Sequence, residues 1–488
     1  MSTDGYSSDC ELVIGLVSPV GVNLDDVKNR MESLFLQFNY KVNFLHLSQI
    51  ADKYINSNFS TAIGEQTRLK QCMDVGLELR KKFKRQDFYS LLAIYTINEK
   101  RESNKKNIMP FKRKVHIIRS LKNTEEIETL RNVYGEGFFL IGVSSSIENR
   151  KDYLINIKGV PENEVDALIA RDDNESSDFG QKTRDVFQLA DAFITTDNRD
   201  NLSKQLSRLL DLLFSKPVIS PTSDEYAMFM AYAASVRSAD LSRQVGAVIT
   251  NEQGDILATG ANDVPKFGGG LYWPNEFDQR DHIKKYDSNE DEKNNIILKV
   301  MKKLESEQSE KDDDLLSKGK KLLKDTGILR ISEYGRSVHA EMEALLSAAR
   351  NGTPIRNCTL YTTTYPCHNC AKHLVAAGIN RVQYVEPYPK SYAINLHGDS
   401  INANGSVDKE KVNFEHFVGV GPRRFVDLFS MNLSSGRKLK RKDNGKLIDW
   451  NRNTAELRVP MKPLSYLEAE LLLLRELADL ENQGKDDE

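Results

Sequence analysis

The sequence predicts an α/β protein made of two domains that follow one another along the chain. Its 488 residues are enough for two to four domains of roughly 100–200 residues each. In the first half, short apolar runs alternate with amphipathic stretches, which predicts a parallel sheet covered by helices on both faces. The second half continues with a hairpin signal and then with alternating helices and strands, an order that suits a three-layer α-β-α sandwich.

The first predicted domain, residues 1–217, begins with the apolar run 11–17, which a Ser-Pro-Val-Gly loop connects to an amphipathic stretch at 24–38. This order predicts a strand, a glycine-containing loop and a helix. Further apolar runs and amphipathic stretches predict strands at 91–95, 115–118, 138–143 and 190–196 and helices at 123–134 and 201–214. Prolines and turn-forming residues at 216–222 then predict the domain boundary.

The second predicted domain, residues 218–430, begins with a helix at 224–236. Two apolar segments, 244–250 and 255–260, flank a turn that contains Gly254, which predicts a β-hairpin. The same patterns predict the remaining elements as a helix at 340–350, a strand at 358–363, a helix at 370–377 and a strand at 381–385.

A charged insertion at 276–325 interrupts the second domain. Charges of both signs are dense there and aromatic residues are rare, so the segment is either an exposed helical excursion or partly disordered. Some apolar periodicity at 295–304 and 315–323 favours the helical alternative.

The C-terminal extension, residues 431–488, is predicted to be helical because apolar residues recur at every third or fourth position near its end. These residues form one apolar seam, which packs either on its own domain or on another subunit. The seam consists of Leu464, Leu467, Leu471, Leu474 and Ala478.

The composition excludes several classes of protein. The 68 Lys and Arg residues are balanced by 71 Asp and Glu residues, and the formal net charge of −3 argues against a broad basic surface for nucleic acid. No apolar run reaches the roughly 18–20 residues of a membrane-spanning helix, and residues 1–11 do not resemble a signal peptide. Five cysteines are too few for a disulfide framework. We therefore expect a cytoplasmic protein without membrane contact.

The residues with the clearest chemistry are His339, Cys367 and Cys370. Zinc binds imidazole and thiolate ligands tetrahedrally, and a catalytic site uses three protein ligands so that the fourth position can hold water. The two cysteines are three positions apart at the start of a predicted helix, where both sulfurs can face one point and the helix N-terminus favours thiolate. His339 also begins a predicted helix. The sequence therefore predicts a catalytic Zn²⁺ site.

Glu341 is the candidate catalytic residue beside this metal. It lies two residues after His339, about 200° around a helix, so it is not expected to bind the same ion. A carboxylate beside a zinc-bound water can accept its proton and pass it to a ring nitrogen. The His-Ala-Glu and Pro-Cys-His-Asn-Cys segments resemble the motifs of zinc-dependent base deaminases. A structural zinc site is the alternative for the cysteine pair alone, but no fourth Cys or His lies in register.

Three segments resemble the deoxycytidylate deaminase family in their order and composition: residues 238–247, residues 258–265 and the zinc motifs. This resemblance implies deamination of a deoxycytidine nucleotide. It also implies that Asn262 hydrogen-bonds the sugar or base of the nucleotide and that Ser238 and Arg243 lie beside its phosphates. The charged insertion replaces a short loop of the family, so the details of phosphate binding and regulation are not carried over.

The loop after the first predicted strand has the place of a phosphate-binding loop, between a strand and a helix. The Lys-Ser/Thr pair that such a loop uses for phosphate and magnesium is Val22-Asn23 here, so an intact kinase site is not expected. A degenerate nucleotide-binding loop and a structural turn are both open interpretations. The candidate nucleotide-binding residues are Gly15, Ser18, Gly21 and Asn23.

A P-loop kinase-like domain followed by a deoxycytidylate deaminase domain resembles the bacterial anti-phage dCTP deaminases. Segments 386–391, 396–401 and 418–424 also resemble the C-terminal part of that group. The resemblance implies deamination of free dCTP, with dCMP as a second substrate, and depletion of the dCTP pool during infection. It further implies a homo-oligomer, a regulatory nucleotide such as dTTP and an inhibitory RNA or protein.

Three other functions are open alternatives. A housekeeping dCMP deaminase that supplies dUMP for thymidylate synthesis would use the same zinc chemistry, although the large first domain argues against it. A deaminase that edits DNA or RNA would need a basic channel, which the net charge of −3 disfavours. A nucleotide sensor without turnover is disfavoured because Glu341 and the three zinc ligands are all present.

Overall fold

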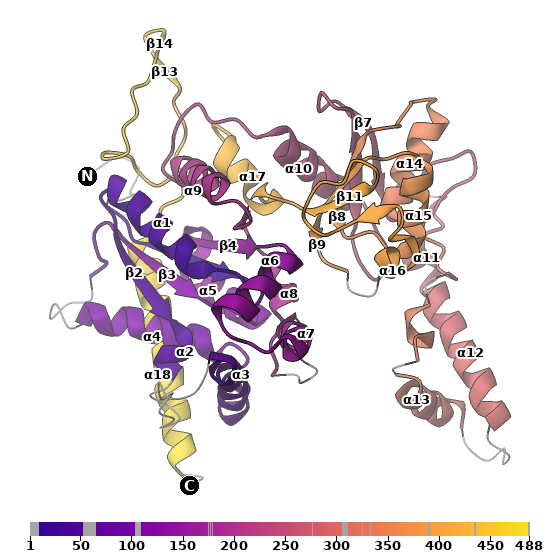
Figure 1. Cartoon of the computed structure of the whole chain (residues 1–488), viewed down its shortest axis with the longest axis horizontal. Coiled ribbons are helices and arrows are strands. Elements are labelled where there is room, and N and C mark those ends of the chain that lie inside the picture. The colour runs from indigo at the N-terminus through magenta and orange to yellow at the C-terminus, as the bar shows by residue number, and fades with distance from the viewer. Residues whose placement is uncertain are drawn as a thin grey trace. The chain divides into compact units, whose positions relative to one another are not determined.

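The computed structural model describes residues 9–486, apart from 52–64, 103–108, 174, 176, 178, 276, 305–310, 325, 332, 389–390 and 434–435. The chain forms two compact units, the first comprising residues 1–225 and 417–488 and the second residues 226–416 (Figure 1). This division differs from the predicted boundaries. Residues 417–430 belong to the first unit rather than the second, and residues 431–488 are part of the first unit rather than a separate extension.

A doubly wound sheet forms the centre of the first unit. Its six strands have the order β12-β5-β4-β1-β3-β2, in which strands β1 to β5 are parallel and the short β12 is antiparallel to β5. The predicted α/β class is therefore confirmed, while the likeness to a P-loop kinase stays a prediction. The strands are β1 (Leu12–Val17), β2 (Lys41–His46), β3 (Lys114–Arg119), β4 (Phe138–Ser144), β5 (Ala192–Thr195) and β12 (Gly419–Val420), and a separate hairpin consists of β13 (Lys442–Asp443) and β14 (Lys446–Leu447).

Helices flank this sheet, and the alternation of side chains along β1 shows how the core is built. Leu12, Ile14 and Leu16 point into a core that also contains the buried faces of α1 and α9. None of the described helices is both long and apolar enough to cross a membrane. The helices of the first unit are α1 (Leu24–Gln37), α2 (Leu47–Ala51), α3 (Glu65–Lys82), α4 (Phe88–Glu102), α5 (Thr124–Tyr134), α6 (Ile147–Asp152), α7 (Glu162–Asp173), α8 (Thr183–Phe187), α9 (Arg199–Leu213), α17 (Pro422–Phe429) and α18 (Pro463–Asp486).

The strand predicted at 91–95 is wrong, because these residues lie inside α4. The helix is buried around much of its circumference, with Leu92, Ala93 and Ile94 fully inaccessible. A run that is apolar on all sides cannot be assigned to a helix or a strand by its periodicity. The second strand along the chain is β2 instead. It is an edge strand with several polar residues, so a search for apolar runs does not detect it.

The C-terminal segment rejoins the first unit through main-chain and side-chain contacts. Val420 of β12 donates its N–H to Oε1 of Glu225 at 2.8 Å, and β12 extends the sheet beside β5. Helix α18 packs on α4 and α5 of its own unit (Figure 1). Of the predicted seam, Leu467 is buried and Leu471 and Leu474 are half-buried, whereas Ala478 is exposed. This is one of the two alternatives that the sequence left open.

The sheet of the second unit also has six strands, in the order β10-β11-β9-β8-β6-β7. Strand β6 is antiparallel to both β7 and β8, whereas β8, β9, β11 and β10 run parallel to one another. The predicted hairpin corresponds to β6 and β7. The strands are β6 (Gly246–Thr250), β7 (Ile256–Ala261), β8 (Thr359–Thr364), β9 (Arg381–Glu386), β10 (Ile401–Asn402) and β11 (Val412–His416).

Helices lie on both faces of this sheet, as the predicted three-layer sandwich requires. Gly246 faces the backbone of α10, whereas Gly260, which pairs with Ala247, faces the backbone of α14. Successive residues of a strand point to opposite faces, so α10 and α14 cover different faces. The helices of this unit are α10 (Ser223–Ser235), which begins at the boundary, α11 (Asp281–Lys284), α12 (Ser288–Leu304), α13 (Asp312–Leu322), α14 (Ala340–Arg350), α15 (His368–Ala376) and α16 (Ala393–His397).

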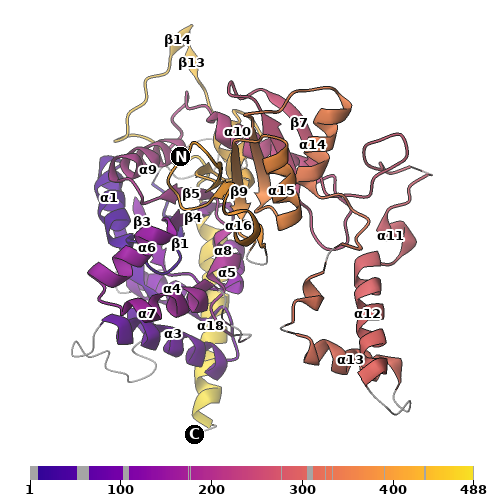
Figure 2. The ribbon, with the colours of Figure 1, turned by 45° about the vertical axis from the view of Figure 1, so that its right-hand side comes forward.

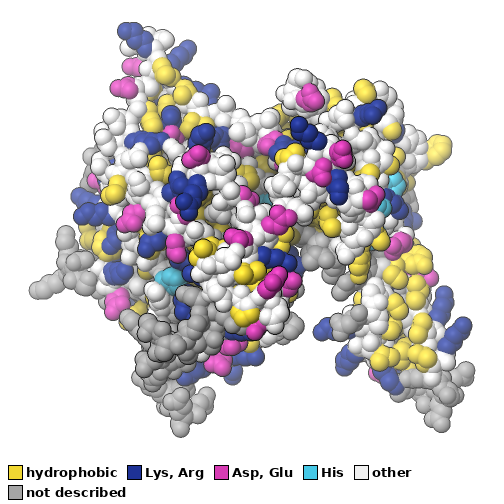
Figure 3. All heavy atoms as spheres, viewed as in Figure 1, with side chains coloured by type: hydrophobic (Ala, Val, Ile, Leu, Met, Phe, Trp, Pro, Cys, Tyr) yellow, Lys and Arg dark blue, Asp and Glu magenta, His cyan; other side chains and the backbone are white. Residues whose placement is uncertain are grey.

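The described part of the charged insertion is helical, in agreement with the favoured alternative. Helices α12 and α13 pack on each other around Ile297, Met301 and Leu315, and they extend away from the sheet of the second unit (Figures 1 and 2). Apolar side chains gather on one face of this pair in the space-filling view (Figure 3). Residues 276, 305–310 and 325 of the insertion lie outside the described residues.

Candidate zinc site and its cavity

The structure brings the three predicted zinc ligands together at the N-terminal ends of two helices. His339 immediately precedes α14, Cys367 immediately precedes α15, and Cys370 lies in the first turn of α15. Nδ1 of His339 is 3.4 Å from Sγ of Cys367 and 3.3 Å from Sγ of Cys370. The three potential ligand atoms all lie within 4.8 Å of one another.

This donor set fits a zinc ion. In a tetrahedral site with Zn–N of about 2.0 Å and Zn–S of about 2.3 Å, the nitrogen and a sulfur are about 3.6 Å apart, close to the distances between these atoms. Hydrogen bonds from Cys370 and His339 lower the pKa of the Cys367 thiol to about 4, although burial acts in the opposite direction. A thiolate at this position is the form that binds metal.

Glu341 lies beside the ligands without being one of them. Its side chain is buried in the first turn of α14, and its Oε2 accepts a hydrogen bond from Sγ of Cys370 at 3.4 Å. Burial raises the pKa of this carboxyl group. The arrangement gives a carboxyl next to the metal position that can hold and transfer a proton.

A cavity of about 320 Å³ opens onto the zinc ligands and Glu341. Its volume is within the range of small-molecule sites. The wall comes from the loop before β6, from the residue after β7, from the first part of the insertion and from the segment that leads from residue 335 into α14. The end of β8 and the segments that follow β8 and β9 complete it. The lining residues are Asp240, Leu241, Ser242, Arg243, Val245, Asn262, Asp281, Asp287, Asn289, Gly335, Arg336, Ser337, His339, Ala340, Glu341, Thr364, Tyr365, Cys367 and Tyr388.

Two of the three predicted substrate-binding residues line this cavity. Arg243 does so while its Nη1 donates to Oε1 of Glu386 at 2.7 Å. Asn262 also lines it, but its amide is held by the main chain, because Oδ1 accepts from the N–H of Val245 at 2.7 Å and Nδ2 donates to the carbonyl of Arg243 at 2.8 Å. Ser238 is absent from the described lining and donates its hydroxyl to the carbonyl of Asn262 at 2.6 Å. Ser238 and Asn262 therefore position the segment that carries Arg243.

The structure adds lining residues that sequence reasoning missed, and they come from the first part of the insertion and from the segment between the insertion and His339. Nη1 of Arg336 donates to Oδ1 of Asp281 at 2.6 Å, and both side chains line the cavity. Asn289, at the start of α12, lines it as well. Because Arg336 precedes His339 by only three residues, its position next to the zinc motif was the available signal.

The predicted nucleotide-binding residues of the first unit do not form one loop. Gly15 lies inside β1, where it pairs with Ile118 and Leu140, so its assignment to the loop is wrong. Ser18 and Gly21 follow the strand. Asn23 caps α1 by accepting hydrogen bonds from the main-chain N–H groups of Asp25 and Asp26.

The part of the chain that carries this site is similar to one family of zinc-binding deaminases. The family described as "Cytidine and deoxycytidylate deaminase zinc-binding region" matches residues 221–386. This match and the grouped ligands confirm the predicted Zn²⁺ cofactor. Residues 221–386 are therefore a cytidine and deoxycytidylate deaminase zinc-binding region.

Individual relatives agree with this assignment. ComE operon protein 2 of Bacillus subtilis is 42% identical over 65 residues, which are 13% of this chain and 34% of that protein. The deoxycytidylate deaminase of phage T4 is 46% identical over 54 residues, 11% of this chain and 28% of that protein. The human deoxycytidylate deaminase is 23% identical over 221 residues, 44% of this chain and 91% of that protein. The chain thus spans about a third or less of the length of the first curated relatives it matches.

Solved structures were compared as well. The dCMP deaminase of cyanophage S-TIM5 in complex with dCMP and dUMP is 20% identical, and the match covers 41% of this chain and 99% of that chain. The TM-score is 0.24.

Replacement of Gly260 with alanine is expected to weaken zinc binding about 10–100-fold, the range for changes to groups that support metal ligands. A Cβ atom at this position would lie 2.1 Å from the carbonyl oxygen of Ala340 and 2.5 Å from the nitrogen of Ala344. Helix α14, which follows His339 and contains Glu341, would have to move away from β7. Zinc affinity measured by competition with a chelator tests this expectation. The control is Gly76→Ala, where the nearest atom would be 3.5 Å away, and equal zinc affinity of the two variants would contradict the prediction.

Proposed function

We propose that this protein hydrolytically deaminates free deoxycytidine nucleotides, with dCTP as its main substrate and dCMP as a second one. The observation that carries the proposal is the grouping of His339, Cys367 and Cys370 with the carboxyl group of Glu341 in one cavity. The match of residues 221–386 to the deaminase zinc-binding region supports the same chemistry.

Each of these side chains has a task in the proposed reaction. His339, Cys367 and Cys370 would hold the zinc ion, which supplies a nucleophile at neutral pH by lowering the pKa of a water ligand. Glu341 would accept a proton from the attacking water and deliver it to the ring nitrogen of cytosine. It would then accept the proton of the newly added hydroxyl group and pass it to the departing amine, which leaves as ammonia. Its burial excludes bulk water from this proton transfer.

The cavity also contains groups suited to the phosphates of a free nucleotide. Arg243 and Arg336 both line it, and each guanidinium is held by a carboxylate, Glu386 and Asp281 respectively. A phosphate can accept hydrogen bonds from such guanidinium groups in the bidentate geometry that arginine favours. The two arginines therefore support phosphate binding at this cavity, and the preference for dCTP over dCMP rests on the resemblance to the anti-phage dCTP deaminases.

A housekeeping dCMP deaminase remains a second candidate, because several relatives carry the name deoxycytidylate deaminase. The resemblance to anti-phage dCTP deaminases supports depletion of the dCTP pool as the biological role instead. That resemblance also supports the proposals of a homo-oligomer in the cytoplasm, of control by dTTP and of an inhibitory RNA or protein.

Ammonia release by zinc-replete protein distinguishes these functions. The substrates are dCTP, dCMP, CTP, cytidine and a cytosine-containing single strand, each with and without dTTP. Turnover of dCTP supports the proposal, turnover of dCMP alone supports the housekeeping alternative, and activity on the strand alone supports editing. No turnover of any free nucleotide in any condition would contradict the proposed function.

Replacement of Arg336 with alanine is expected to lower kcat/KM for dCTP by about tenfold or more, the usual effect of losing a charged hydrogen bond. Deoxycytidine has no phosphate, so its kcat/KM is expected to change little. Ammonia release from the two substrates gives the comparison. The control is Arg356→Ala, because Arg356 is exposed and absent from the described lining of the cavity. Equal losses for dCTP and deoxycytidine in the Arg336→Ala protein would contradict the proposed phosphate contact.

A further inference from the structure

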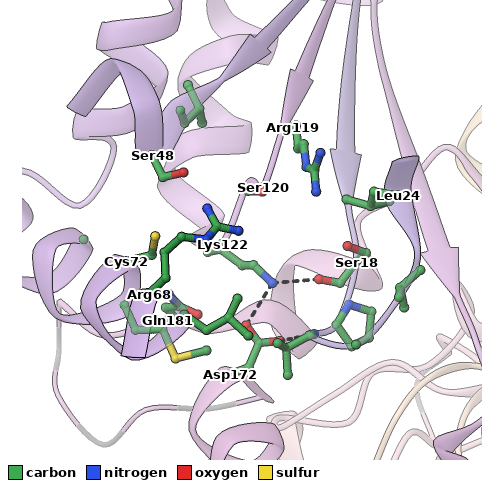
Figure 4. Close-up of a pocket in the computed structure, with 18 of the residues that line it drawn as sticks. Ser18, Leu24, Ser48, Arg68, Cys72, Arg119, Ser120, Lys122, Asp172 and Gln181 are labelled. Atoms are coloured by element: carbon green, nitrogen blue, oxygen red, sulfur yellow. Dashed lines mark hydrogen bonds and ion pairs between the residues drawn. The ribbon is translucent and has the colours of Figure 1, made fainter. Parts of the chain in front are cut away.

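A second cavity, of about 180 Å³, lies in the first unit at the carboxyl ends of the central strands (Figure 4). It is lined by Ser18 and Val20, which follow β1, and by Arg119 and Lys122, at the end of β3 and just after it. Strand β1 lies between β3 and β4, so the chain connections wind in both directions from this point. In open parallel sheets, ligands bind outside the carboxyl ends of the strands at such a point.

The described wall of this cavity is strongly cationic. It includes one carboxylate, Asp172, and five basic side chains, which are Arg68, Arg80, Arg119, Lys122 and Lys158. The partners of two of these cations, Glu126 for Arg80 and Asp25 for Arg119, do not line the cavity. The nearby His46 adds no positive charge at neutral pH, because burial and the charges of Arg119 and Arg68 lower its pKa to about 4. On the described wall itself, basic side chains therefore outnumber carboxylates.

Asp172 neutralises part of this wall and also engages the loop after β1. Its Oδ1 accepts a hydrogen bond from Nζ of Lys122 at 2.9 Å, and its Oδ2 accepts one from the N–H of Val20 at 2.8 Å (Figure 4). Lys122 also donates to the carbonyl of Ser18 at 2.7 Å. An ammonium group and a loop N–H are the donors that an anion would use here, and both are held by the chain's own carboxylate.

Other residues of the lining are suited to an organic group rather than to a bare anion. Leu69, Met73 and Leu154 contribute apolar surface from one hydrophobic cluster. Gln181 also lines the cavity, and its side chain is only 8% exposed. Its Oε1 has no hydrogen-bond partner among the described residues. A buried acceptor of this kind is stabilised by a donor on a ligand, such as a sugar hydroxyl or an amino group.

We propose that this cavity binds a phosphorylated organic molecule of the nucleoside triphosphate class, whose phosphates pair with Lys122 and Arg119 in place of Asp172. Asp172 occupies the anion position when no ligand is bound. The inference uses no residue of the zinc cavity, and it holds whether or not that cavity deaminates a nucleotide.

Calorimetric titration of the full-length protein with ATP, dTTP and tripolyphosphate tests the proposal. Saturable binding of at least one of the nucleotides is expected. Lys122→Met is expected to weaken this binding by about tenfold or more, because a charged hydrogen bond is lost. Asp172→Asn is expected to strengthen it by about tenfold, because the competing negative charge is removed while an acceptor for Val20 remains. Arg336→Ala is the control for binding in the zinc cavity and should leave this affinity unchanged.

The Asp172→Asn variant separates an effect on the binding site from damage to the fold, because a damaged fold would not increase the affinity for the nucleotide. The absence of saturable binding by both nucleotides would overturn the proposal. Binding that Lys122→Met leaves intact, or that Asp172→Asn weakens, would overturn it as well. Tripolyphosphate that binds as tightly as the nucleotides would overturn the assignment of an organic group to the side of Gln181.

Discussion

Replacement of Glu341 with glutamine is expected to lower ammonia release from dCTP by at least about a thousandfold, within the range that general acid–base catalysis contributes. Glutamine has nearly the same shape as glutamate but cannot accept and return a proton at neutral pH. The side chain is buried beside Cys370, so bulk water cannot easily take over its task. Because the three zinc ligands are unchanged, the variant should retain zinc. Turnover and metal content of the same preparation are the two measurements.

A matched control lies two residues further along the same helix. Glu343 is also buried, but its Oε1 accepts a hydrogen bond from Nη2 of Arg350 at 2.6 Å, and it is not among the described residues of the zinc cavity. Glu343→Gln should keep both zinc and most of the turnover. Ammonia release at the normal rate by the Glu341→Gln protein would show that Glu341 does not transfer the proton.

Replacement of Glu470 with alanine is expected to destabilise the first unit by about 3–5 kcal/mol, the usual effect of breaking a buried ion pair. Glu470 of α18 is fully buried, as is Arg101 of α4, which donates to it. Tyr134 and Asn98 also donate to Glu470, at 2.8 Å and 3.2 Å. Alanine would leave these donors without the acceptor that α18 supplies. The free energy of unfolding in urea is the measurement.

The control for this prediction is the same substitution at an exposed position of the same helix. The carboxylate of Glu476 is 55% exposed and pairs with Arg85 at 3.0 Å. An exposed ion pair contributes about 0–1 kcal/mol, so Glu476→Ala should change the free energy of unfolding only slightly. Equal losses in the two variants would show that the buried network does not hold α18 on its unit.

The zinc ligands were predictable from the sequence because the information is local. Cys367 and Cys370 are three positions apart, and the types of residue, with His339, match what zinc binds. The helices that begin near these residues could also be predicted, and this placed each ligand at the N-terminal end of a helix. The positions of most strands along the chain were predictable for a similar reason, since the alternation of apolar runs and amphipathic stretches reports local structure.

The cavity around the zinc ligands was predictable only in part. Arg243 was found through its segment, but Arg336 and Asp281 were not, because they are 55 positions apart and meet only in the folded unit. Asp281 lies in a charged segment and has no local signal of the cavity that it lines, whereas the signal for Arg336 is its place three residues before His339. The same limit applies to Asp172, which meets the loop after β1 at Val20, 152 positions earlier in the chain.

The sequence by itself determined the metal chemistry, the α/β class and most of the individual elements. The tertiary structure alone decided which segments share a unit. Val420 donates to Glu225 across 195 positions, and Arg101 pairs with Glu470 across 369 positions. It also decided that residues 91–95 are helical. Leu91, Leu92, Ala93 and Ile94 are all buried, so this apolar run has no periodicity that would identify a helix. The physical reason is that periodicity and motif spacing act over a few residues, whereas domain composition and cavity walls depend on contacts between residues far apart in the chain.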